Sequence, residues 1–162
     1  MPHTDTGRAV IEATPDEIFA ALLDAEARAV WLPPAGMTGR FEWFDARPGG
    51  GYRMVLRYDD PTVPGKSGAN TDVTEVRFVA IEAPSRVVEE ADFVADDPRF
   101  AGTMTMTWTV APHPSGSLVT ITATDVPDGI DSADHTTAFA STLANLEAWL
   151  RAQELRPRKV AE

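Results

Sequence analysis

The chain of 162 residues contains no cysteine, so it can form no disulfide, no thiolate nucleophile and no cysteine-ligated metal site. It also lacks any apolar run approaching the roughly 20 residues that a membrane-spanning helix needs. Its first residues do not combine a charged segment with an apolar one, as a secretory signal does. We therefore expect a soluble, cytoplasmic protein with no membrane partner.

Basic residues are scarce. Lys and Arg number 14 against 25 Asp and Glu, which gives a formal net charge of −11. Nucleic acids and anionic membranes favour proteins with clustered Lys and Arg, so we expect neither as a partner. The apolar fraction of 43% and the charged fraction of 24% are typical of a folded domain, and the length suits a single one.

The first part of the chain predicts one strand followed by two short helices. Residues 7–13 alternate between apolar and polar side chains, as a strand does. Residues 14–17, with the sequence Thr-Pro-Asp-Glu, then supply an N-cap, a proline in the first turn and a capping-box glutamate. A second short helix is predicted over residues 24–30. It ends before the prolines at 33–34, which cannot donate backbone hydrogen bonds.

The rest of the chain predicts strands and then one long helix. Period-two alternation indicates six strands, at residues 40–44, 52–58, 73–81, 86–93, 103–110 and 118–125. The signal is strongest where Met104, Met106 and Trp108 alternate with threonines. From Asp131 or Ser132 onward, apolar residues recur at helical spacing. The order β-α-α-β-β-β-β-β-β-α, without internal repeats, predicts a single α+β domain over residues 1–162.

Three motifs carry a resemblance to a known superfamily. They are Ala-Thr-Pro-Asp-Glu-Ile-Phe-Ala-Ala-Leu at 13–22, Trp-Leu-Pro-Pro at 31–34 and Asp-Ala-Arg-Pro-Gly-Gly at 45–50, supported by residues 81–87 and 143–150. In these segments the chain resembles the START-like (SRPBCC) superfamily, and it is most similar to homologues of the activator of heat-shock-protein-90 ATPase. The resemblance covers about residues 6–152 and leaves 153–162 as a frayed tail. It implies a helix-grip (START/Bet v-like) fold, in which a curved antiparallel sheet surrounds a long C-terminal helix.

The resemblance implies less about function than about fold. The superfamily includes lipid carriers, hormone receptors, polyketide cyclases and co-chaperones, so the fold alone does not select an activity. The eukaryotic activator carries a separate N-terminal chaperone-binding domain, which the few residues before residue 6 do not supply. We therefore do not expect a chaperone partner, and a homodimer stays compatible with the sequence.

Strand alternation and the apolar stripe of the final helix predict a set of inward-facing residues. The predicted ligand-binding set is Tyr52, Met54, Leu56, Tyr58, Met104, Met106, Trp108, Phe139 and Leu143. These side chains either fill the core or line a pocket that the curved sheet leaves open. Methionine suits adaptable binding surfaces because its side chain is flexible and polarizable. The tyrosine hydroxyls could orient a ligand in a mostly apolar pocket.

The sequence leaves the catalytic residues unknown and offers two candidates, His135 and Tyr58. His135 falls one turn before Phe139 on the predicted helix, where a neutral imidazole could act as a general base together with Tyr58. An ordinary first-turn histidine beside helix-capping carboxylates is the alternative. The other histidines, His3 and His113, fall in a terminus and a turn, so the spacing predicts no metal site. No motif predicts a cofactor.

Three hypotheses follow for the function. The first is a small-molecule binding protein with an apolar cavity between the sheet and the final helix, binding a small apolar molecule. The second is an enzyme of the cyclase, dehydratase or hydrolase kind that uses His135 and Tyr58. The third is a chaperone-associated interaction protein that uses the outer face of the sheet. Residues 59–70, which contain two prolines and two glycines, form either a lid over the cavity or a surface insertion.

Overall fold

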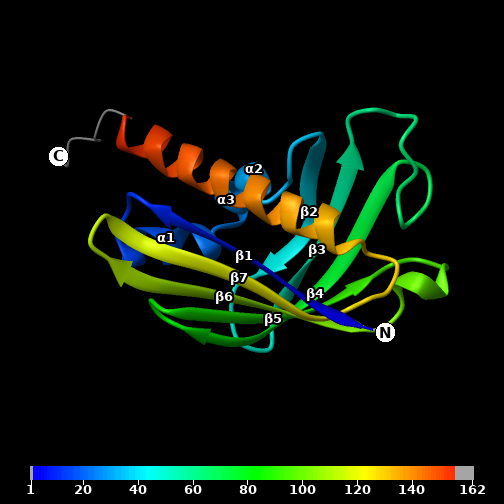
Figure 1. The fold of residues 1–162 in the computed structure, drawn as a ribbon, viewed down its shortest axis with the longest axis horizontal. Helices are drawn as coiled ribbons and strands as arrows, with labels where there is room; N and C mark the ends of the chain where they lie inside the picture. The colour runs from blue at the N-terminus through cyan, green and yellow to red at the C-terminus, as the bar shows by residue number, and fades with distance from the viewer. Residues whose placement is uncertain (1, 156–162) are drawn as a thin grey trace.

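The computed structural model describes residues 2–155 and contains one curved antiparallel sheet that wraps a long helix (Figure 1). The strands are β1 (His3–Ile11), β2 (Met37–Asp45), β3 (Gly51–Tyr58), β4 (Thr71–Glu82), β5 (Arg86–Phe93), β6 (Thr103–His113) and β7 (Gly116–Val126). The helices are α1 (Pro15–Leu22), α2 (Ala25–Trp31), α3 (Ser132–Glu154) and the 3-10 turn η1 (Pro98–Phe100). The sheet order is β1-β7-β6-β5-β4-β3-β2. This architecture confirms the predicted α+β helix-grip fold and its element order.

The two short helices form where the sequence supplies their caps. The Thr14 side chain accepts a hydrogen bond from the Glu17 backbone N–H at 3.2 Å, and the Glu17 carboxylate accepts one from the Thr14 backbone N–H at 3.3 Å. This reciprocal pair is the predicted capping box. Asp24 is the N-cap of α2, and its side chain accepts a hydrogen bond from the Ala27 backbone N–H at 3.2 Å. Local chemistry is therefore sufficient to start both helices.

Helix α3 packs across the concave side of the sheet by its apolar stripe (Figure 1). The buried members of the stripe are Phe139, Thr142, Leu143, Leu146 and Leu150. At its N-terminal half α3 lies very close to β1, because a Cβ atom at Gly7 would stand only 2.8 Å from Cβ of Phe139. Only a glycine at this position lets the helix approach the strand so closely.

Polar side chains of α3 fix the segment that follows α2. The Thr142 hydroxyl donates to the carbonyl of Leu32 at 2.9 Å, and the Asn145 amide donates to the carbonyl of Pro33 at 2.9 Å. The prolines in this segment leave backbone carbonyls without helical partners, and the two side chains satisfy them. The connection between α2 and β2 is thereby held at one end of the space between helix and sheet.

The structure departs from the predicted elements most clearly in three places, while the other helices and strands begin and end within about three residues of their predicted bounds. Strand β1 begins at His3 rather than at residue 7, because its polar first residues pair with the backbone of β7 although they show no apolar alternation. The turn η1 was not predicted. Helix α3 continues through Glu154, so residues 153 and 154 are helical rather than frayed. Leu155 is the C-cap of this helix, and residues 156–162 of the predicted tail lie outside the described residues.

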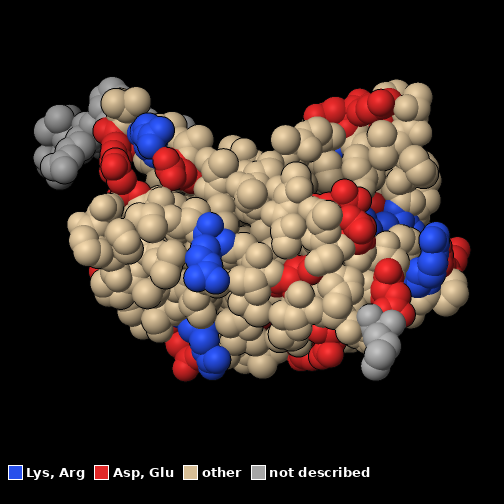
Figure 2. Space-filling view, in the orientation of Figure 1, with Lys and Arg blue, Asp and Glu red and all other residues tan. Residues whose placement is uncertain are grey.

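The outer face of the sheet carries paired charges. Arg53 on β3 contacts Glu42 on β2 at 2.8 Å and also Glu75 on β4, and Arg77 contacts Asp92 on the adjacent strand at 2.9 Å. On the face drawn in Figure 2, Lys and Arg side chains lie as separate groups among Asp and Glu rather than as one basic patch. Between residues 2 and 155, no helix is both long and apolar enough to cross a membrane.

Candidate ligand-binding site

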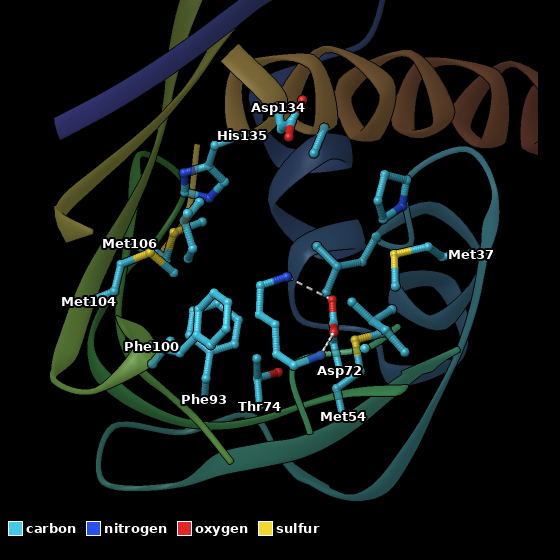
Figure 3. Close-up of a pocket in the computed structure, with 18 of the residues that line it drawn as sticks. Met37, Met54, Asp72, Thr74, Phe93, Phe100, Met104, Met106, Asp134 and His135 are labelled. Carbon is cyan, nitrogen blue, oxygen red and sulfur yellow. Dashed lines mark hydrogen bonds and ion pairs between the residues drawn. The ribbon is translucent and has the colours of Figure 1, made fainter. Parts of the chain in front are cut away.

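A cavity of about 610 Å³ lies between α3 and the concave face of the sheet. Its walls come from β3 to β7, the start of α3, the segment after α2 and the loop between β3 and β4. Apolar side chains make most of the wall; they include Leu32, Met37, Met54, Leu56, Val76, Phe93, Phe100, Met104, Met106, Trp108, Ile121, Ile130 and Phe139. Figure 3 shows the labelled side chains surrounding an open centre. The volume falls within the range of about 300–1,000 Å³ that is usual for small-molecule sites.

Methionine is concentrated at this cavity. The chain has five methionines, and the four that follow Met1 all line it. Met104 and Met106 extend from β6 on one side, and Met37 and Met54 lie on the opposite side (Figure 3). Because methionine side chains are unbranched and polarizable, they can adjust to ligands of different shape. The wall is therefore apolar and deformable at the same time.

One edge of the cavity carries a polar cluster centred on Asp72, a buried residue of β4. Its carboxylate accepts hydrogen bonds from the Lys66 ammonium at 2.9 Å, the Lys66 backbone N–H at 2.7 Å and the Tyr58 hydroxyl at 3.2 Å. Burial, together with the neighbouring Asp72 carboxylate, raises the pKa of Tyr58 to about 12. Tyr58 is therefore a protonated hydrogen-bond donor at neutral pH.

The same cluster anchors the loop between β3 and β4. The Lys66 ammonium lies 5.5 Å from the ring centroid of Phe93 and 5.7 Å from that of Phe100, within cation–π range. Pro64, Gly65 and Lys66 of this loop line the cavity. The loop predicted as a lid or an insertion therefore lies at the cavity, and its role as a lid stays a prediction.

On the opposite side, His135 projects from the first turns of α3 toward Met104 and Met106 (Figure 3). Its Nδ1 atom lies 2.7 Å from Oδ2 of Asp5, whose side chain is fully buried. The Asp5 carboxylate also contacts the Ser132 hydroxyl and, at 3.0 Å, Nε2 of His3. The ring centroids of His135 and Phe139 are 4.2 Å apart. These contacts fix the orientation of the His135 imidazole.

Burial and the polar contacts between Asp5 and His135 shift the pKa of each residue in opposite directions. Burial would raise the pKa of Asp5, but the hydrogen bonds from Ser132 and His135 outweigh it and hold the pKa below its ordinary value. Burial lowers the pKa of His135 below 6.5, and the Asp5 carboxylate offsets this effect only in part. At neutral pH the pair therefore consists of a carboxylate and a neutral imidazole.

An ion pair is buried beside the floor of the cavity. The guanidinium of Arg28 on α2 donates to Glu89 on β5 at 2.6 Å and to the carbonyl of Leu22 at 3.1 Å. The hydroxyl of Tyr52 donates to the other oxygen of Glu89 at 3.0 Å. Tyr52 and Trp108 both line the cavity, and the centroids of their rings lie within 5.4 Å of the Arg28 guanidinium carbon. The Arg28–Glu89 ion pair therefore lies directly behind two residues of the cavity wall.

Within residues 2–155, two side-chain atoms in this region are buried without a hydrogen-bond partner. They are Nε of Arg28 and Nε1 of Trp108. Burial alone would lower the pKa of Arg28, but the Glu89 carboxylate outweighs it and raises the pKa above its ordinary value. Burial also raises the pKa of Tyr52. Arg28 is therefore cationic and Tyr52 protonated in the folded protein.

The structure places eight of the nine predicted ligand-binding residues on the cavity wall. They are Tyr52, Met54, Leu56, Tyr58, Met104, Met106, Trp108 and Phe139. Leu143 does not line the cavity; it is 1% exposed and lies in the packed core of α3. The helical stripe that predicted it covers both the cavity wall and the packed half of the interface, and spacing alone does not separate the two. Whether these residues bind a ligand stays a prediction.

The two catalytic candidates both line the cavity, but no hydrogen bond joins them within the described chain. His135 is held by Asp5 and Tyr58 by Asp72. Sequence reasoning missed Asp5, because its strand was predicted to begin only at residue 7. It also missed Arg28 and Glu89. For Glu89 a signal was available, because it is a charged residue at an inward position of an alternating strand. Within residues 2–155, no cluster of three or more His, Asp or Glu side chains could hold a metal ion.

Solved structures share this fold over nearly the whole chain. Protein CV1439 from Chromobacterium violaceum is 28% identical, with a TM-score of 0.81 over 93% of this chain and 98% of that one. A protein from Rhodobacter sphaeroides is 19% identical, with a TM-score of 0.74 over 93% of each chain. A protein from Arthrobacter aurescens is 16% identical, with a TM-score of 0.77 over 93% of this chain and 87% of that one. The last two show the fold alone.

Sequence comparison places the chain in a family. No curated protein matches it. The model of the family described as Activator of Hsp90 ATPase homolog 1-like protein matches residues 12–151, which include β2 to β7 and most of α3. This range contains every predicted ligand-binding residue, whereas Asp5 lies outside it. Since the match covers most of the chain, the protein belongs to the family of Activator of Hsp90 ATPase homolog 1-like proteins.

Proposed function

We propose that the protein binds a small, largely apolar molecule in the cavity between α3 and the sheet. The observation that carries this proposal is a cavity of about 610 Å³ whose wall includes four methionines, three phenylalanines and one tryptophan. Water gains few hydrogen bonds against such a wall, so an apolar ligand that displaces it is favoured. Polar side chains, among them Tyr58, Asp72 and His135, also line the cavity and can orient one end of the ligand.

The experiment is a titration with N-phenyl-1-naphthylamine, a neutral fluorophore whose emission rises in apolar surroundings. Two variants of α3 locate the binding. Ala138→Phe adds a ring at a residue that lines the cavity, whereas Ala140→Phe adds the same ring on the exposed face of the helix. We expect saturable binding to the wild type, at least tenfold weaker binding to Ala138→Phe, and unchanged binding to Ala140→Phe.

Urea unfolding of both variants checks that they are folded. Absence of saturable binding to the wild type would refute the proposal. Equal binding by both folded variants would refute the assignment to this cavity. Native mass spectrometry of the purified wild type adds an independent measurement, since a retained ligand increases the mass of the folded protein only.

A second candidate function is catalysis with His135 as a general base. The observation that favours it is the neutral imidazole on the cavity wall, oriented through Nδ1 by the buried carboxylate of Asp5. This arrangement suits proton abstraction from a bound substrate. Tyr58 would then serve as a donor, because its pKa of about 12 keeps it protonated. If any compound that binds is also converted, His135→Ala should reduce the rate by about 10² to 10⁴.

A further inference from the structure

The Asp5–His135 pair determines which imidazole nitrogen is available to a ligand. Asp5 is ionised, and a carboxylate can only accept hydrogen bonds. The contact of 2.7 Å between Oδ2 of Asp5 and Nδ1 of His135 therefore requires the proton on Nδ1. In the neutral ring, Nε2 then carries a lone pair and no proton. Asp5 thus selects the tautomer in which Nε2 is an acceptor.

This acceptor faces the cavity and is unused. His135 lines the cavity, and its side chain is 12% exposed. No hydrogen bond engages Nε2 anywhere between residues 2 and 155. The charged or titratable groups that act on the ring are Asp5 and His3 from β1 and Lys66 from the β3–β4 loop; Asp131 and Asp134, at the N-terminal end of α3, also line the cavity. A partner for Nε2 must therefore come from solvent or from a ligand.

The surroundings define the kind of ligand group that fits. An acceptor such as Nε2 needs a donor. A ligand carboxylate offers none and would lie near Asp131 and Asp134, and the two cations that line the described cavity, Lys66 and Arg99, are already paired with Asp72 and Asp97. A ligand ammonium would lose its hydration against a mostly apolar wall, which is strongly unfavourable, and the solvent-exposed carboxylates of Asp131 and Asp134 offset little of that cost. A neutral donor such as a hydroxyl group avoids both penalties.

We propose that the cavity selects neutral, largely apolar ligands that carry a hydroxyl group, and that this hydroxyl donates its hydrogen bond to Nε2 of His135, which Asp5 holds in place. The proposal rests on the proposed function and adds the chemical class of the ligand. Asp5 is a positioning residue that acts through His135. Asp5 precedes the segment matched by the family model, so this selectivity depends on a residue outside that segment.

The test compares two probes of the same shape. 2-Naphthol carries the donor, and 2-methylnaphthalene replaces it with a methyl group. Each is titrated against bound N-phenyl-1-naphthylamine, and the ratio of the two dissociation constants is the readout. His135→Asn keeps an amide donor near the position of Nδ1 but removes Nε2. His135→Gln brings an amide oxygen toward the position of Nε2. His113→Gln, at the exposed end of β6, is the control.

We expect His135→Asn to reduce the preference for 2-naphthol by about 3- to 10-fold, the range of a net hydrogen bond. His135→Gln should retain part of the preference, and His113→Gln should retain all of it. Asp5→Asn should weaken the preference without abolishing the binding of 2-methylnaphthalene. An unchanged ratio in His135→Asn, or a ratio lost in Tyr58→Phe instead, would overturn the proposal. Failure of the wild type to bind either probe would refute the proposed function itself.

Discussion

The buried ion pair beneath the cavity gives a quantitative prediction. Arg28 is 1% exposed and Glu89 2% exposed, and their shortest contact is 2.6 Å. Arg28→Met keeps an unbranched apolar side chain but removes the guanidinium. Glu89 would then be buried with only the Tyr52 hydroxyl as a donor. Removing one partner of a buried pair lowers the free energy of unfolding by about 3–5 kcal/mol.

That loss is a large part of the total stability of a domain, which is about 5–15 kcal/mol. For a chain of this length, 1 kcal/mol shifts the melting temperature by about 2–4 °C, so the variant should melt about 6–20 °C below the wild type. Urea unfolding at pH 7, followed by tryptophan fluorescence, measures the free energy directly. The slope of the unfolding free energy against urea concentration should be unchanged, because the two proteins expose a similar surface area on unfolding.

A double variant separates the missing charge from the lost packing. In Arg28→Met/Glu89→Gln, the amide still accepts the Tyr52 hydroxyl bond but needs no counter-charge. The double variant should therefore be more stable than Arg28→Met alone, although it contains one more change. A loss below about 1 kcal/mol in Arg28→Met, the size seen for surface pairs, would refute this reasoning. So would a double variant that is as unstable as the single one.

Three further predictions concern the site and its supports. Gly7→Ala places a methyl group 2.8 Å from Cβ of Phe139 and should lower the free energy of unfolding by about 1–3 kcal/mol, measured in urea. The pKa of His135 in the folded protein is below its ordinary value of 6.5, so as the pH drops this residue is protonated in the unfolded chain before it is protonated in the folded one. The free energy of unfolding of the wild type should therefore decrease below pH 6.5, and that of His135→Gln should decrease less steeply. Asp72→Asn weakens the contacts that hold Lys66 in the loop at 59–70, so amide exchange in that loop should accelerate. Unchanged exchange would argue against a role of the loop as a lid.

The aromatic and methionine side chains show how much of the site was predictable. In β6, Met104, Met106 and Trp108 occupy alternate positions, and successive side chains of a strand point to opposite faces. A local pattern therefore sufficed to assign all three to the concave side, where they line the cavity. The same logic failed for Leu143, because an apolar stripe on a helix contacts both packed core and open space. Only the curvature of the sheet decides which part of that stripe faces the cavity.

The sequence by itself determined the order of the main helices and strands, since caps, turn residues and the period of apolar side chains act over a few residues. It also determined the apolar character of the inner face. The tertiary structure alone decided which polar groups meet inside. Asp5 and His135 are 130 positions apart, and Arg28 and Glu89 are 61 positions apart. Such pairs form only when strand register and helix docking bring them together, and burial then shifts the pKa values that no local pattern encodes.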